Sequence, residues 1–196
     1  MKLIGLTGTT GSGKGYISAE FAKSGIPSID TDAIVHRLYR EDAECIATLM
    51  GQFGNVSAAD GSIDRKKLGV IVFADKDKLD LLNSIVHRLV RREVDRICLA
   101  KEQEGVEMLL LDAPLLYEAG MEALCECVIA VTAPRALRLQ RICARDGIDQ
   151  AAAERRMKNQ HSDAFFAEKA DYVICNDGIA SVPEQVKQII GELRNG

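Results

Sequence analysis

The sequence lacks two features that would direct the protein to a membrane or to a nucleic acid. No apolar run approaches the ~20 residues that a helix needs to cross a bilayer. The formal net charge of −4 gives no overall basic surplus to attract a nucleic acid. Residues 1–5 already form the start of an expected strand rather than a signal peptide. We therefore expect a cytoplasmic protein with no membrane and no nucleic-acid partner, either a monomer or a small homo-oligomer.

The cysteines and histidines lack the spacing of a metal site. None of the six cysteines forms a Cys-x-x-Cys pair, and the three histidines are scattered, so no zinc pattern arises. Cys125 and Cys127 are the only close pair. Reduced and mostly buried thiols in a reducing compartment are the favoured interpretation.

The chain also lacks internal repeats and low-complexity tracts. Its 196 residues, 47% hydrophobic and 28% charged, suit one globular core domain with small insertions. Five short apolar runs alternate with helical patterns, which is typical of a parallel α/β sheet covered by helices on both faces. The runs are residues 3–6, 26–29, 108–111, 128–131 and 172–174.

Two connections between these runs are too long to be simple loops. Residues 30–107 carry mainly helical patterns, such as residues 79–101, and must form a subdomain of their own. A second insertion, residues 134–170, begins as a helix. The last helix follows a capping box that starts at Ser181. Its apolar stripe is Val186, Ile189, Ile190 and Leu193.

A glycine-rich turn follows the first apolar run. Residues 8–15 read Gly-Thr-Thr-Gly-Ser-Gly-Lys-Gly and precede a helical pattern over residues 16–23. Glycines let the backbone N–H groups point inward, and the new helix adds its unpaired N–H groups and the positive end of its dipole. Lys14 would reach the β- and γ-phosphates. The pattern predicts a cradle for a nucleoside triphosphate; a glycine-rich turn that binds nothing is the alternative.

The position after Lys14 lacks the hydroxyl group that this motif requires. A serine or threonine there binds Mg²⁺, whereas this chain has Gly15, followed by Tyr16.

Carboxylates follow two of the expected strands. Asp30 and Asp32 end the second run, and residues two apart in an extended chain point the same way, toward the crevice beside the loop. A carboxylate there can accept the proton of an attacking hydroxyl; helix capping by Asp32 is the alternative. Asp112 ends the third run, where an acid commonly helps to hold Mg²⁺ directly or through water; a turn-starting aspartate is the alternative.

Four arginines recur at helical spacing in the second insertion. The spacings of three, three and four residues put the guanidinium groups on one helix face. A solvated charged face is one interpretation. The other is a clamp on the triphosphate, because this helix lies on the side where α/β sheets bind ligands. The four are Arg135, Arg138, Arg141 and Arg145.

Taken in order, these motifs resemble those of the dephospho-coenzyme A kinase family from end to end. Residues 112–118, Asp-Ala-Pro-Leu-Leu-Tyr-Glu, resemble the family's D-x-P-L-L-F/Y-E, which is quite specific. The other matching segments are residues 5–8 with 11–14, 29–32, 60–65 with 68, 73, 82–87, 141 with 145–147 and 160, and 170–174 with 176–178.

The resemblance implies a P-loop kinase fold, with a five-stranded parallel sheet flanked by helices, a helical substrate-binding insertion and a lid. It also implies ATP-dependent phosphorylation of the ribose 3′-hydroxyl of dephospho-coenzyme A, the final step of coenzyme A biosynthesis, with Mg²⁺. The implied parts are a nucleotide-binding core (residues 1–32, 106–133 and 168–196), the coenzyme-binding insertion (residues 33–105) and the lid (residues 134–167).

Carried over by position, the family's functional residues fall into three groups. Asp32 would be the general base, Lys14 the phosphate ligand and Arg141 a lid residue on ATP, while Asp112 would hold the metal, directly or through water. The implied ATP-binding residues are Gly8, Thr9, Thr10, Gly11, Ser12, Gly13, Lys14, Gly15, Tyr16, Arg141, Arg145 and Asn176. The implied substrate-binding residues are Asp32, Arg65, Asn83, His87, Leu115 and Glu118.

Three residues depart from the family pattern. Gly15 replaces the Mg²⁺-binding hydroxyl, Arg88 replaces a proline, and Arg138 stands where the lid helix often has glutamine. Two other functions stay open: a related nucleoside or nucleotide kinase, and a nucleotide-binding protein with a degenerate loop. A GTPase is disfavoured, since no Asn-Lys-x-Asp follows the fourth run.

Overall fold

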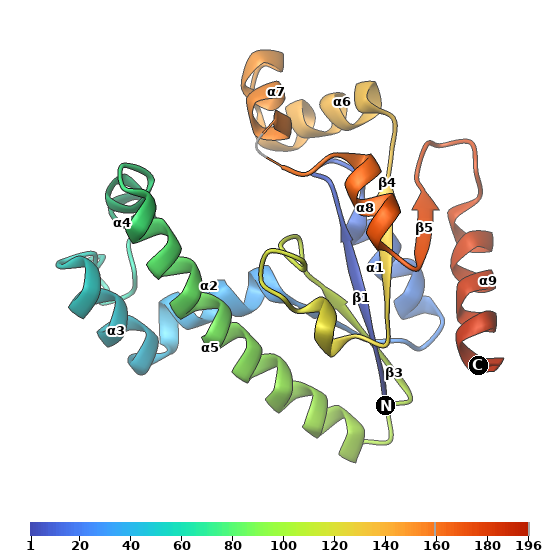
Figure 1. Ribbon diagram of the computed structural model, residues 1–196, viewed down its shortest axis with the longest axis horizontal. Helices are drawn as coiled ribbons and strands as arrows, with labels where there is room; N and C mark the ends of the chain where they lie inside the picture. The colour runs from blue at the N-terminus through green and yellow to red at the C-terminus, as the bar shows by residue number, and fades with distance from the viewer. Residues whose placement is uncertain (159, 196) are drawn as a thin grey trace. The chain divides into compact units, whose positions relative to one another are not determined.

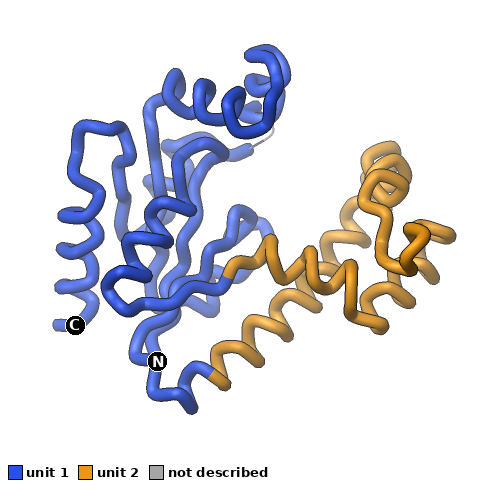
Figure 2. Tube along the Cα trace, turned by 180° about the vertical axis from the view of Figure 1, so that it is seen from behind, with its two compact units in different colours: residues 1–29, 101–196 blue, residues 30–100 orange. Residues whose placement is uncertain are grey.

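The computed structural model describes residues 1–158 and 160–195. The chain divides into two compact units, residues 1–29 with 101–196 and residues 30–100, coloured separately in Figure 2. The first unit holds the sheet, and the second is helical.

A five-stranded parallel sheet lies at the centre of the first unit, in the order β2-β3-β1-β4-β5 (Figure 1), which confirms the predicted fold class. Leu6 of β1 pairs with Asp112 of β3, and Gly8 of β1 pairs with Val131 of β4. Each predicted run overlaps one strand. The strands are β1 (Lys2–Gly8), β2 (Ser28–Asp30), β3 (Met108–Asp112), β4 (Cys127–Thr132) and β5 (Tyr172–Cys175).

Both faces of this sheet are covered. Consecutive strand residues, whose side chains point to opposite faces of the sheet, are both fully buried, as at Leu110 and Leu111. This is expected for parallel strands with helices on either side. On one face, Phe21 of α1 and the predicted apolar stripe of α9 pack against the strands in one core cluster. The described helices of this unit are α1 (Lys14–Lys23), α6 (Arg135–Asp146), α7 (Gln150–Lys158), α8 (Asp163–Lys169), α9 (Val182–Asn195) and the short 3₁₀ helix η1 (Glu122–Leu124).

The second unit consists of helices whose starts are set by aspartates. Asp30, Asp42 and Asp64 each accept a hydrogen bond from a backbone N–H in the first turn of the helix that follows. The helices are α2 (Thr31–Glu41), α3 (Ala43–Phe53), α4 (Arg65–Phe73) and α5 (Lys76–Gln103), and α5 continues into the first unit.

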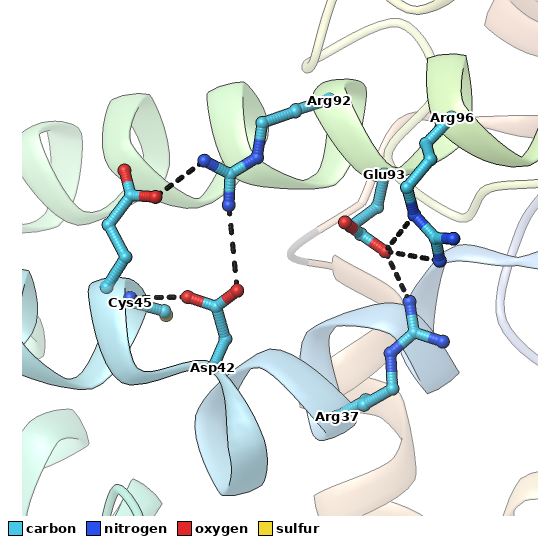
Figure 3. Close-up of polar contacts among 7 residues, drawn as sticks. Arg37, Asp42, Cys45, Arg92, Glu93 and Arg96 are labelled. Carbon is cyan, nitrogen blue, oxygen red and sulfur yellow. Dashed lines mark hydrogen bonds and ion pairs between the residues drawn. The ribbon is translucent and has the colours of Figure 1, made fainter.

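Ion pairs tie α5 to α2 and α3 (Figure 3). Arg92 pairs with Glu44 at 2.6 Å and with Asp42 at 3.6 Å, and Glu93 accepts from Arg37 at 2.6 Å and from Arg96 at 3.1 Å. Arg88 lies exposed within α5, where the helix continues without interruption. None of the described helices is both long enough and apolar enough to span a bilayer.

Candidate nucleotide-binding site

Three glycines shape the loop between β1 and α1, which we call the phosphate loop (residues 8–15). Gly8, Gly11 and Gly13 have φ angles of +143°, +78° and +96°, which side-chain-bearing residues rarely adopt. A Cβ atom at Gly8 would collide with the Val131 backbone, and one at Gly11 would lie 2.7 Å from the Arg138 carbonyl oxygen. Glycine is therefore required here both by conformation and by space.

The N-terminus of α1 presents positive charge. Its N-cap, Gly13, has no side-chain oxygen, and its first turn has no acidic residue, so the helix dipole is not offset locally. Lys14 is the first residue of α1 and is half-buried; among residues 1–158 and 160–195 no carboxylate forms an ion pair with its ammonium group. This end of the helix suits a phosphate group.

Arg141 and Asn176 hold the loop from the side of its carbonyl groups. Arg141 Nη1 donates to the carbonyl oxygens of Gly11 (3.3 Å) and Ser12 (3.2 Å), and its Nη2 donates to the Asn176 carbonyl oxygen (3.2 Å). The Asn176 Nδ2 group donates to the Ser12 oxygen at 2.7 Å. The Gly11 and Ser12 carbonyl groups are thus bound by protein donors and do not face an anion bound by the loop. The structure thus brings predicted ATP-site residues from three distant segments together.

The four predicted arginines of α6 do not share one environment. Arg135 is exposed and pairs with Glu154 at 3.2 Å, and the exposed Arg145 pairs with its neighbour Asp146 at 2.8 Å. Arg138 is buried and Arg141 half-buried against the phosphate loop. The four guanidinium groups therefore do not form one cluster, and a clamp on the triphosphate stays a prediction. The hydrogen bond from Arg145, with the charge of Arg156, lowers the pKa of the Asp146 carboxyl group.

The aspartates after β2 divide their roles differently from the sequence prediction. Asp32 lies in the first turn of α2, so it does not continue an extended strand, and the prediction that Asp30 and Asp32 point the same way in an extended chain is wrong. Asp30 is the N-cap, accepting from the Ala33 N–H at 3.1 Å. The capping alternative for Asp32 is therefore wrong as well, and its exposed carboxylate is not used as the cap.

Asp112 ends β3 opposite Leu6, next to the strand that leads into the phosphate loop. It is half-buried. Such a position at the carboxyl edge of a parallel sheet suits a carboxylate that acts on a ligand at that edge.

The predicted substrate residues belong to both units. Leu115 and Glu118 follow β3 in the first unit, and Glu118 lies 3.5 Å from His161. Arg65 begins α4 in the second unit, where its guanidinium contacts His36 at 3.0 Å. Asn83 and His87 lie one turn apart on α5, and therefore on one face of it.

Sequence reasoning missed Asp163, which accepts a hydrogen bond from the Thr9 hydroxyl at 2.8 Å. It also missed the backbone contact of Gln160, whose Oε1 accepts from the Thr10 N–H at 2.8 Å. The one sequence signal was the position of Gln160 in the motif series; nothing marks Asp163, since an aspartate at a helix start is ordinary.

The cysteines are less buried than predicted. Cys45 and Cys127 are buried, and the other four are half-buried. Burial, together with neighbouring carboxylates, raises the pKa of each of these two buried thiols to about 11, so both are neutral at physiological pH.

Comparisons with known proteins agree with one another. The family model described as dephospho-CoA kinase matches residues 2–181. A dephospho-CoA kinase of Rhizobium etli is 35% identical over 195 residues, which is 99% of this chain and 95% of that protein. A crystal structure of a Thermus thermophilus protein has a TM-score of 0.81 at 32% identity, with 98% of this chain and 97% of that one covered. A dephospho-CoA kinase from Campylobacter jejuni has a TM-score of 0.69 at 29% identity, with 98% of both chains covered.

Proposed function

The chain belongs to the dephospho-CoA kinase family, and from that premise we propose that it transfers the γ-phosphoryl group of ATP to the ribose 3′-hydroxyl of dephospho-coenzyme A. The products are coenzyme A and ADP. Membership in the family confirms the resemblance predicted from the motifs. The structural observation that carries the proposal is the phosphate loop, held open toward an anion beside a lysine that forms no ion pair within the described chain.

The loop and Lys14 bind and orient the triphosphate. Inward backbone N–H groups and the α1 dipole suit the β-phosphate, and the Lys14 ammonium suits the oxygens that gain charge as the terminal bond breaks. Arg141 supports this arrangement by holding the carbonyl groups of Gly11 and Ser12. Because the guanidinium is committed to the loop, we assign Arg141 to loop geometry and to the adjoining nucleotide rather than to the transferred phosphate.

Asp32 is proposed as the general base. Its carboxylate accepts the proton of the 3′-hydroxyl as that oxygen bonds to the γ-phosphorus and the bond to the β–γ bridging oxygen breaks, releasing ADP. Because Asp30 forms the N-cap hydrogen bond of α2, the Asp32 carboxylate is not needed as the cap.

The residues fit a magnesium ion held mainly by phosphate and water. Mg²⁺ accepts one or two carboxylates, keeps several waters and, when bound, neutralises charge on the β- and γ-oxygens. Asp112 supplies a carboxylate at the correct edge of the sheet, and Gly15 supplies no hydroxyl. We propose that a water molecule takes the place of that missing ligand. We also propose that Arg145 and Tyr16 border the nucleotide and that the enzyme works in the cytoplasm.

An ADP-release assay with dephospho-coenzyme A, with and without Mg²⁺, tests the function. The proposal expects Mg²⁺-dependent release that needs this acceptor, and coenzyme A as the product. Nucleosides and nucleotides in the same assay serve as competing acceptors. Preferred phosphorylation of one of them would assign the chain to a different kinase activity, and ATP binding without any transfer would identify a binding protein.

A further inference from the structure

A partly buried ion pair between α6 and the start of α8 also contacts the phosphate loop. The carboxylate of Asp163 accepts two hydrogen bonds, one on each oxygen: from Thr9 Oγ1 at 2.8 Å and from Arg138 Nη2 at 2.7 Å. Arg138 is only 8% exposed and Thr9 only 3% exposed. We call these three residues, Thr9, Asp163 and Arg138, the Asp163 bridge.

Arg138 is fixed at both ends of its guanidinium group. Besides the ion pair, its Nε donates to the Ala133 carbonyl oxygen, directly after β4, at 3.1 Å. A buried guanidinium that lost its carboxylate would be left as an uncompensated charge, so this pair is costly to break. The Arg138 backbone also packs against the loop, leaving no room for a side chain at Gly11.

Thr9 transmits this constraint to the loop backbone. Its carbonyl oxygen accepts the Ser12 N–H at 3.1 Å, which closes the turn of residues 9–12. Holding the Thr9 hydroxyl therefore fixes the orientation of that turn. The Gln160 bond to the Thr10 N–H is a second tie between the same two segments.

We propose that the Asp163 bridge positions the phosphate loop for phosphoryl transfer, so that Arg138 and Asp163 are positioning residues that act through Thr9. The proposal rests on the kinase activity proposed above. A glutamine, which the family often has at position 138, would be a neutral partner for Asp163. Preorganised donors matter because misplacing them by about 1 Å can cost ~100-fold in rate.

Asp163→Asn is the first test. The amide keeps an oxygen for Thr9 but places a donor against the donors of Arg138, which removes the ion pair. The expected result is a fall of ~10-fold or more in kcat/KM for ATP, carried by both kcat and KM, with KM for dephospho-coenzyme A within about twofold of the wild type. Glu154→Gln is the matched control, because it removes the exposed Arg135–Glu154 pair and should change none of these constants.

Thr9→Val is the second test, because it deletes the hydroxyl while keeping the β-branched shape. Combined with Asp163→Asn, it should add little to the effect of the worse single variant, since both changes break the same bridge. Additive losses would overturn the proposal. So would a lower melting temperature of Asp163→Asn with unchanged kcat and KM for ATP, which would make the bridge merely structural.

Calorimetric measurement of the affinity for a non-hydrolysable ATP analogue tests the bridge independently of the proposed function. If the wild type binds the analogue but phosphorylates no dephospho-coenzyme A, the proposed function fails. The bridge then still predicts ~10-fold weaker analogue binding in Asp163→Asn than in Glu154→Gln. Equal affinities of these two variants would overturn the bridge whatever the acceptor is.

Discussion

Gly15 can accept a side chain without strain. An added Cβ would meet no atom within 4 Å beyond its chain neighbours and the backbone of its own helix, and the φ of Gly15 lies outside the left-handed region. Glycine within a helix costs up to ~1 kcal/mol relative to alanine, so a serine should also stabilise the first turn of α1. We therefore expect Gly15→Ser to lower the Mg²⁺ and ATP concentrations needed for half-maximal turnover, with kcat equal or higher.

The measurement is ADP release titrated with Mg²⁺ and with ATP. Gly191→Ser is the matched control: Gly191 is also helical, has equally open surroundings and lies on α9. That change should raise the melting temperature and leave the Mg²⁺ requirement alone. Weaker ATP binding in Gly15→Ser would contradict this prediction and would mean that ATP binding needs the space left by the absent side chain of Gly15.

Asp30 and Asp32 should separate stability from catalysis. Asp32→Asn cannot accept a proton but leaves the cap intact, so turnover should fall ~100-fold or more with little change in the free energy of unfolding. Asp30→Ala removes the cap and should lower that free energy by ~1 kcal/mol. Kinetics and urea unfolding of both variants check this. Normal turnover of Asp32→Asn would remove it from the role of base.

Residues of the glycine-rich motif could be predicted, but the assignment of the two aspartates could not. Spacing and residue type identify Gly8, Gly11 and Gly13 because only glycine tolerates their backbone angles. Which of two nearby aspartates caps α2 depends on where β2 ends, and strand ends are uncertain by a residue or more from sequence alone. That small difference reverses the structural roles of Asp30 and Asp32.

At the level of elements, α6 supports the loop through Arg141. Arg141→Ala would remove three hydrogen bonds to the carbonyl groups of Gly11, Ser12 and Asn176. We expect kcat/KM for ATP to fall ~10-fold or more, because a single hydrogen bond that involves a charged group contributes about 1.5–3 kcal/mol. Steady-state kinetics at varied ATP measure it. Arg194→Ala on α9 is the control and should behave as the wild type; the same small effect in both variants would contradict a role for Arg141.

Helix spacing predicted the faces of α6 and α9 with different success. The stripe of α9 is apolar, and burial of an apolar stripe against a sheet needs only the period of the pattern. The period of a pattern does not show which side of α6 is buried when the residues at that spacing are charged arginines. The environment of each arginine depends instead on partners elsewhere in the chain. Asp163, the partner of Arg138, lies 25 residues further along, and no local pattern links the two.

For the whole molecule, alkaline pH should weaken folding. Burial, then the charges of Asp42 and Glu44, raises the pKa of Cys45 from 9.0 to about 11, and burial raises that of Tyr39 from 10.0 to about 12. The folded state holds these protons more tightly than the unfolded chain. These groups should therefore give the free energy of unfolding no pH dependence below pH 9. That free energy should fall as the pH rises from 9 to 11 through Cys45, and from 10 to 12 through Tyr39.

Urea unfolding at pH 8, 9, 10 and 11 measures this dependence. Cys45→Ala removes one of these groups, while Tyr39 and Cys127, whose pKa is also raised to about 11, remain; the fall between pH 9 and 11 should therefore become shallower but not vanish. An identical slope in the Cys45 variant would exclude this thiol as a cause.

The strands and their parallel arrangement could be predicted because buried parallel strands form continuous apolar runs between helices. The order β2-β3-β1-β4-β5 and the contacts that brace the loop could not be predicted from the runs themselves. These contacts join residues far apart in the sequence, such as Ser12 and Asn176, and no local sequence pattern relates such residues.

The position of β1 at the centre of the sheet has a consequence for biosynthesis. On a chain that leaves the ribosome N-terminus first, β1 appears early but has no sheet partner until β3 (Met108–Asp112) and β4 (Cys127–Thr132) emerge. The helical unit of residues 30–100 is complete before then. The Asn176 amide, which holds the Ser12 carbonyl, follows 164 residues behind its partner. Pairings this distant along the chain close slowly. We therefore expect the nascent chain to acquire its capacity to hold ATP only after Asn176 has emerged.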